Sequence, residues 1–251
     1  MKIWPLGTGG WMPAFGRQTS ATLIEYNNRL ILIDAGTGLS RLTDFSSVLN
    51  RYKAVDLILT HYHQDHIMGL FFLPKFLKDK MLTIWGPGKP YYDRSCQSII
   101  EDSAKQPFGT TGYETIAMQV KCRDYTEEGF KIGPVQIGIT RQNHTLPSFG
   151  ITIDNKLHIA TDTDVKADVF LKPVKLLLHE CWAQSKDQAK EHASMEALQE
   201  AYESQKMDTR IESIGIIHRN PSHSDTEYAQ WMKPPFSLFM KMNSSKYKNF
   251  W

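Results

Sequence analysis

The stretch Thr60-His61-Tyr62-His63-Gln64-Asp65-His66 places four candidate metal ligands within six residues. It follows the run Val55-Asp56-Leu57-Ile58-Leu59, whose apolar character is typical of a buried strand. Because a strand is rigid, it fixes the point from which the ligand-type side chains leave. Imidazole suits zinc, iron and similar ions, and a carboxylate adds negative charge. A solvated loop rich in histidine is the alternative interpretation, but this clustering of ligand types favours a metal site.

Length and composition indicate one soluble α/β domain that spans residues 1–251. The chain has 251 residues, 41% hydrophobic and 22% charged, and its formal net charge of +2 indicates no particular partner. A chain of this length can bury a large core. We find no internal repeat and no linker.

The cysteines and the N-terminus predict a cytoplasmic location. Cys96, Cys122 and Cys181 are scattered and odd in number, which argues against a disulfide framework. The segment Met1–Gly7 has no apolar signal region, and no run approaches the length of a membrane span. We therefore expect no membrane partner.

The N-terminal third reads as strands that end in loops. A strand at Lys2–Leu6 leads into Gly7-Thr8-Gly9-Gly10, which matches no phosphate-binding motif. Strands at Ala21–Tyr26 and Leu30–Ile33 flank the turn Asn27-Asn28. Asp34 follows the second strand, either as the cap of a helix near residues 40–53 or as a residue that orients a ligand histidine.

The remaining pattern alternates helices and strands. We expect helices at 67–80 (interrupted near Pro74), at 91–104 and after an N-cap at Ser194, with 105–114 as a loop. We expect strands at 81–85, 115–123, 131–140, 151–154, 156–160, 175–178 and 211–217.

Further ligand-type residues follow these later strands. His144 comes after the strand at 131–140, Asp162 after that at 156–160, and His218 after that at 211–217. This recurrence at strand ends is typical of an α/β layer whose site lies along one sheet edge. His158 alternates along its strand, and we interpret it as structural.

The heptad and these later residues resemble the metallo-β-lactamase superfamily. The resemblance implies a four-layer αβ/βα sandwich with two divalent metal ions, zinc in the first place and manganese or iron as alternatives. His61, His63 and His144 would hold one ion, Asp65, His66 and His218 the other, and Asp162 would bridge them. Two ions roughly 3.5–4 Å apart stabilise both the attacking and the leaving oxygen of a displacement. Asp65 would also hold the attacking water.

Two loops are similar to those of RNase Z and its phosphodiesterase relatives. His179-Glu180-Cys181-Trp182 resembles the family's His-Glu-Ala-Thr loop, and His192-Ala193-Ser194 resembles its His-Ser-Thr loop. The resemblance implies that Glu180 and His192 form a catalytic pair in which His192 protonates the leaving oxygen. A histidinium held by a carboxylate is a suitable acid near neutral pH.

The long arm with which RNase Z grips tRNA has no counterpart between His144 and Asp162, which are eighteen positions apart. We therefore expect a phosphodiesterase with a small phosphodiester or nucleic-acid-derived substrate, and allow for a homodimer. Another hydrolase of this fold (arylsulfatase-like, lactonase or thioesterase) is the main alternative, and a non-catalytic metal- or RNA-binding module is the third. The basic, aromatic segment 228–251 could contact nucleic acid, but packing on the domain is the favoured interpretation.

Overall fold

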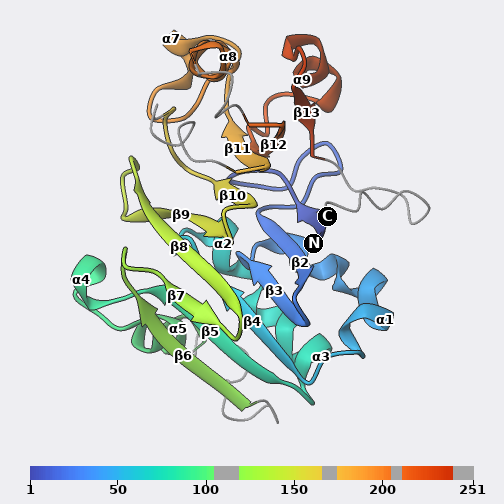
Figure 1. Cartoon of the computed structure of the whole chain (residues 1–251), viewed down its shortest axis with the longest axis vertical. Coiled ribbons are helices and arrows are strands. Elements are labelled where there is room, and N and C mark those ends of the chain that lie inside the picture. The colour runs from blue at the N-terminus through green and yellow to red at the C-terminus, as the bar shows by residue number, and fades with distance from the viewer. Residues whose placement is uncertain (105–118, 166–173, 205–210, 240–251) are drawn as a thin grey trace.

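Two β-sheets pack face to face in the computed structural model, which describes residues 1–104, 119–165, 174–204 and 211–239 (Figure 1). The first sheet has the order β1-β2-β3-β4-β5-β6, with strands Lys2–Gly7, Ala21–Tyr26, Arg29–Ile33, Ala54–Ile58, Met81–Pro87 and Gln119–Tyr125. The second has the order β13-β12-β11-β10-β9-β8-β7, with strands Phe236–Leu238, Ser213–Arg219, Leu176–Cys181, Leu157–Ala160, Ser148–Ile153, Val135–Gln142 and Phe130–Ile132.

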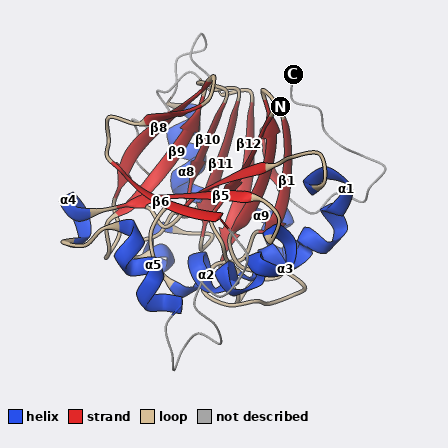
Figure 2. Ribbon diagram, turned by 90° about the horizontal axis from the view of Figure 1, so that it is seen from below, coloured by secondary structure: helices blue, strands red, loops and turns tan. Residues whose placement is uncertain are grey.

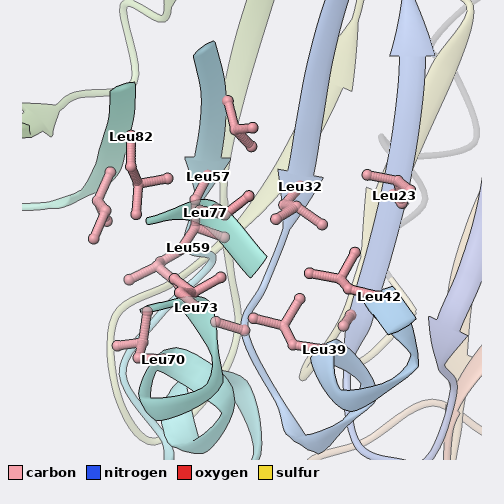
Figure 3. Packing of buried hydrophobic residues seen from close by; sticks show 14 of the residues in the cluster. Leu23, Leu32, Leu39, Leu42, Leu57, Leu59, Leu70, Leu73, Leu77 and Leu82 are labelled. Carbon is pink, nitrogen blue, oxygen red and sulfur yellow. The ribbon is translucent and has the colours of Figure 1, made fainter. Parts of the chain in front are cut away.

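Apolar residues bury central strands such as β3 and β11 on both faces, whereas β6 and β8 have exposed positions. In β3, Leu32 packs on the outer side and Ile31 on the inner side, as successive strand residues point to opposite faces. The inner cluster joins isoleucines of both sheets, including Ile58 and Ile151. One outer cluster joins the first sheet to helices in the N-terminal half of the chain (Figure 3). Another joins the second sheet to helices near the C-terminus.

This order of helices, sheet, sheet and helices is the predicted four-layer αβ/βα sandwich. Figure 2 shows α2, α3 and α5 together on one side of the strands. The helical segments, in chain order, are η1 (Thr37–Phe45), α1 (Ser46–Leu49), α2 (Gln64–Ile67), η2 (Met68–Phe72), α3 (Leu73–Leu77), α4 (Lys89–Tyr92), α5 (Cys96–Ala104), α7 (Lys186–Ala189), α8 (Met195–Glu203) and α9 (Asp225–Trp231). None of the helices in the described ranges is both long and apolar enough to cross a membrane.

Several expected elements differ from the structure in their extent. The helix expected at 67–80 is three short segments, α2, η2 and α3, and α2 already begins at Gln64. The helix expected at 91–104 is divided by Asp93, which is left-handed with φ 54° and so ends α4. The strand expected at 131–140 is two strands, because a turn at Gly133 separates β7 from β8. Residues 105–114 and the start of the strand expected at 115–123 lie outside the described residues.

The parallel strands position the ligand-type residues. Strands β3 to β6 are parallel in the first sheet, and β10 to β13 are parallel in the second. The heptad follows the carboxyl end of β4, Asp162 follows β10, and His218 lies near the end of β12. Carboxyl ends of parallel strands meet at one edge of a sheet, so these residues are delivered to a common place.

Candidate metal centre

The heptad is held in place by Asp34, a fully buried residue that follows β3. The Thr60 backbone N–H donates to Asp34 Oδ1 at 2.8 Å, and His66 Nδ1 lies 2.8 Å from Asp34 Oδ2. The first helical segment after Asp34 has Gly36 as its N-cap and no side-chain cap. Of the two interpretations of Asp34, the structure therefore supports the one in which it orients a histidine. The Nδ1 contact leaves Nε2 of His66 facing the centre.

The structure brings all seven candidate ligands together. Their ligand atoms form two compact groups with Asp162 in one of them, and within each group these atoms lie within 4.8 Å of one another. One group is His61, His63, His144 and Asp162, and the other is Asp65, His66 and His218. A third group, Asp162, His192 and His218, overlaps both and includes the histidine that the sequence assigned as an acid.

Asp162 lies between the two groups. Its Oδ2 is 2.9 Å from His66 Nε2 and 3.1 Å from His218 Nε2, and its Oδ1 is 3.7 Å from His144 Nε2. Asp162 and His218 both adopt left-handed backbone conformations, with φ of 50° and 41°. Such conformations cost on the order of 1–3 kcal/mol each and are concentrated at functional sites.

The arrangement of polar atoms fits divalent cations. Asp162 Oδ2 is buried and makes no hydrogen bond of acceptable geometry within the described part of the chain. Ring nitrogens also face each other: His61 Nε2 and His63 Nδ1 are 3.0 Å apart, and His66 Nε2 and His218 Nε2 are 3.2 Å apart. Converging imidazole nitrogens and carboxylate oxygens are the donor set that zinc, manganese and iron accept.

The pKa shifts describe a centre in which protons and cations compete. Burial alone would lower the pKa of His66, but Asp34, Asp65 and Asp162 raise it well above its ordinary value. Burial opposes ionisation of Asp65, yet His66 and His218 hold its pKa far below its ordinary value. Burial lowers the pKa of His61 well below its ordinary value, which favours the neutral form of the ring, the form that coordinates a metal. Cations bound by Asp65 and Asp162 would take the place of protons on the neighbouring histidines.

Glu180 and His192 form the pair that the sequence suggested. Glu180 is fully buried at the end of β11, and its Oε2 is 2.9 Å from His192 Nδ1. The Thr163 backbone N–H donates to Glu180 Oε1 at 2.7 Å, which fixes the carboxylate. Burial lowers the pKa of His192, but Glu180 outweighs it and raises this pKa above 6.5. The geometry holds the His192 imidazole, hydrogen bonded to a buried carboxylate, beside the candidate ligand His218.

Two tryptophans at the centre were not assigned a role from the sequence. The Trp182 ring stacks on His192 with centroids 4.5 Å apart and an interplanar angle of 16°. The Trp11 backbone N–H donates to Asp65 Oδ2 at 2.7 Å, while its side chain is 70% exposed. A Cβ at Gly10 would lie 2.6 Å from the His218 ring, so this glycine is needed for close approach. In the sequence, only the place of Trp182 two residues after Glu180 indicated that it would contact His192.

Comparison with known sequences identifies a matching family and several relatives. The family model for anti-Pycsar protein Apyc1 matches residues 1–227. The RNase Z of Clostridium acetobutylicum is 31% identical over 165 residues, which are 62% of this chain and 51% of that protein. The RNase Z of Thermococcus onnurineus is 30% identical over 156 residues, 60% of this chain and 46% of its own. The chain thus spans about half the length of these curated relatives.

Solved structures share the fold over nearly the whole chain. A diphosphatase of the PhnP family superposes with a TM-score of 0.71 at 12% identity, covering 94% of each chain. The metallo-β-lactamase fold protein YhfI of Bacillus subtilis gives 0.69 at 19% identity, over 94% of this chain and 93% of its own. The short form of human tRNase Z gives 0.65 at 20% identity, over 89% of this chain and 95% of its own. The chain therefore belongs to the anti-Pycsar protein Apyc1 family, within the RNase Z-like branch of the metallo-β-lactamase superfamily.

Proposed function

We propose that this chain, as one domain over residues 1–251, is a dinuclear metal-dependent phosphodiesterase. The observation that carries the proposal is the position of the Glu180–His192 pair against seven converged ligand atoms. His61, His63 and His144 would hold one ion, Asp65, His66 and His218 the other, and Asp162 both. When bound, two divalent ions activate the attacking water and stabilise charge on the attacking and leaving oxygens.

Asp65 orients the attacking water in this proposal. Its Oδ2 accepts from the Trp11 N–H and lies 3.2 Å from His218 Nε2, so the carboxylate is fixed on two sides. Its lowered pKa favours the ionised carboxylate, which can accept a hydrogen bond from water. Because this acceptor is already fixed next to Asp162, it can orient the water without a further loss of side-chain entropy during the reaction.

His192 supplies the proton to the leaving oxygen. Because its Nδ1 is hydrogen bonded to Glu180, its Nε2 is the position from which a proton is delivered. An alkoxide is a poor leaving group, so protonation accelerates cleavage of an unactivated ester. Hydrolysis of acyl substrates does not need this pair, which favours phosphodiesters over lactones and thioesters.

The substrate that fits best is a small phosphodiester, cyclic or activated. Strands β9 and β10 fill the segment between His144 and Asp162 with an antiparallel hairpin, so that segment holds no arm for a large RNA. The RNase Z relatives nevertheless support a nucleic-acid-derived substrate.

A substrate panel tests the proposal. The full chain, reconstituted separately with zinc and with manganese, is assayed against bis-p-nitrophenyl phosphate, cyclic nucleotides, a sulfate ester, a lactone and a precursor tRNA. We expect turnover of the phosphodiesters and none of the sulfate ester or lactone. Faster turnover of the lactone or the sulfate ester would replace this function by the corresponding hydrolase.

A further inference from the structure

A second polar cavity, of about 410 Å³, lies away from the metal centre. It opens between the inner face of β4, β5 and β6 and the edge strand β7. Strands β5, β6 and β7 lie together at the lower left of Figure 1. Its lining includes Ala54 and Met81, the first residues of β4 and β5. The metal centre follows the carboxyl end of β4, so the two sites face opposite ends of the parallel strands.

The cavity lies on the inner face of the first sheet, at positions where polar and charged residues stand in place of the isoleucines found nearer the core. Ile31 pairs with Asp56, Asp56 with Thr83, and Thr83 with Lys121, so these four side chains form one row across the sheet. Ile31 belongs to the core between the sheets. From Asp56 outward the row lies next to the edge strand β7, and its polar side chains line the cavity.

The lining is strongly cationic. It contains four cations and one carboxylate, namely Arg29, Lys121, Arg123 and Lys131 with Asp56. The whole chain has a formal net charge of only +2, so this local excess is a product of folding. Another cavity, of about 520 Å³ beside β8 and β9, is lined by Glu127 and Asp154 and by no lysine or arginine.

Both arginines make packing contacts, although Arg29 is only half-buried and Arg123 is exposed. A Cβ at Gly133 would lie 2.4 Å from Arg29 Nη2, so the guanidinium rests against a glycine whose φ is +57°. Arg123 lies over the Trp85 ring at 5.4 Å from its centroid, and Trp85 itself stacks on Phe130 at 4.1 Å. Packed guanidinium groups lose less conformational entropy when they bind an anion.

The single carboxylate cannot neutralise this charge. Asp56 is partly buried and accepts a hydrogen bond from Trp85 Nε1 at 2.9 Å. Burial raises the pKa of Asp56 above its ordinary value, although Trp85, Arg29 and Arg123 act against that shift. One negative charge facing four positive ones leaves an excess of three positive charges, of which a dianion would neutralise two.

We propose that this cavity binds the phosphate group of a nucleotide-sized phosphomonoester. Guanidinium groups match the geometry of phosphate oxygens and bind them through paired hydrogen bonds. The volume lies within the range of roughly 300–1,000 Å³ that is usual for small-molecule sites. The site would accept its ligand independently of hydrolysis at the metal centre.

The test follows the indole N–H signal of Trp85 in the ¹⁵N-labelled full chain, which has six tryptophans. Inorganic phosphate, adenosine 5′-monophosphate and adenosine are titrated at low ionic strength, and the Trp85→Phe variant assigns the signal. We expect a saturating shift with the monophosphate and none with adenosine. A shift with inorganic phosphate of equal affinity would show that the phosphate group alone is recognised.

Charge reversal locates the binding. In the Lys121→Glu/Lys131→Glu variant we expect the affinity to fall by about tenfold or more, because two attractive charges become repulsive. The Lys75→Glu/Lys78→Glu variant makes the same change on exposed residues of α3 and its C-cap and should bind as the wild type does. No shift with either phosphate compound, a shift with adenosine, or equal binding by both variants would overturn the proposal.

Discussion

Asp162 is the residue on which both halves of the candidate centre depend. Its carboxylate lies within 3.1 Å of two imidazoles of one group and within 4.0 Å of His61 and His144 in the other. His218, by contrast, belongs to the group that it forms with Asp65 and His66. Removing Asp162 should therefore affect both ions, and removing His218 mainly one.

The metal content of two variants tests this difference. After reconstitution and dialysis, we expect about two equivalents in the wild type, about one in His218→Ala and less than one in Asp162→Ala. Elemental analysis measures all three. Equal retention by the two variants would show that Asp162 does not bridge, and less than one equivalent in the wild type would contradict the dinuclear centre.

His192 should matter in proportion to how poor the leaving group is. We expect His192→Ala to slow cleavage of alkyl phosphodiesters roughly 10²–10⁴-fold, the usual contribution of a general acid. Cleavage of bis-p-nitrophenyl phosphate should suffer far less, since p-nitrophenolate leaves without protonation. Rates on both substrates, with the metal content of the variant, give the comparison.

His223→Ala serves as the matched control, because His223 pairs with Glu227 at the start of α9. It should leave both rates unchanged. Equal losses on the two substrates in His192→Ala would mean that His192 has a structural or ligand role, as its place in the third ligand group also allows.

At the scale of elements, helix ends differ in how they are capped: α2, which carries Asp65 and His66, has no side-chain cap, whereas α9 has a complete one. Helix α9 begins with a capping box, in which the Ser224 side chain accepts from the Glu227 backbone and the Glu227 carboxylate accepts from the Ser224 backbone. Ser224→Ala should lower the free energy of unfolding by about 1 kcal/mol. Urea denaturation measures it, and Ser222→Ala, an exposed neighbour outside the box, is the control that should show no loss.

The same capping box predicts a dependence on acid. Hydrogen bonds from the Ser224 backbone and side chain, together with His223, lower the pKa of Glu227 from 4.5 to about 2. A lowered pKa in the folded state means that the stabilisation is complete above pH 4.5 and disappears as the pH falls toward 2.

Glu227→Gln removes the charge without shortening the side chain. The melting temperature of the wild type should exceed that of this variant near neutral pH, and the difference should shrink as the pH falls below 4.5. Thermal melts of both proteins across this range give the answer. A difference that does not change with pH would show that the ionised carboxylate contributes nothing to the cap.

At the scale of the whole molecule, affinity for a large RNA requires a basic surface that spans several phosphates. The chain has a net charge of +2, and its basic cavity has a volume suited to one small anion. We therefore expect weak binding of precursor tRNA that falls steeply as salt rises, alongside turnover of small phosphodiesters. Binding and cleavage are measured side by side at physiological salt.

Submicromolar binding with a clean cut at the 3′ trailer would contradict this expectation. Truncation of residues 241–251, which lie outside the described residues, would then show whether the basic C-terminal segment holds the RNA. Unchanged hydrolysis of bis-p-nitrophenyl phosphate by the truncated chain is the control.

Much of the fold followed from local patterns in the sequence. The hairpin at Asn27-Asn28, the strand before the heptad and the Ser194 cap of α8 depend on neighbouring residues, and all three are present. Short helices were less predictable, since η1 and η2 are 3₁₀ turns held by packing on the sheet. Helix α9 was missed, although its Ser224-x-x-Glu227 signature was present.

The sequence by itself determined which chemical groups the chain offers and which strand ends carry them, because both depend on residues adjacent in the chain. Only the tertiary structure decided that Asp34 orients His66, that Trp182 stacks on His192, and that four cations meet at one cavity. These contacts join residues from separate strands and loops. Their distances depend on strand pairing, on loop conformation and, at the cavity, on how the two sheets pack, and no local pattern encodes these.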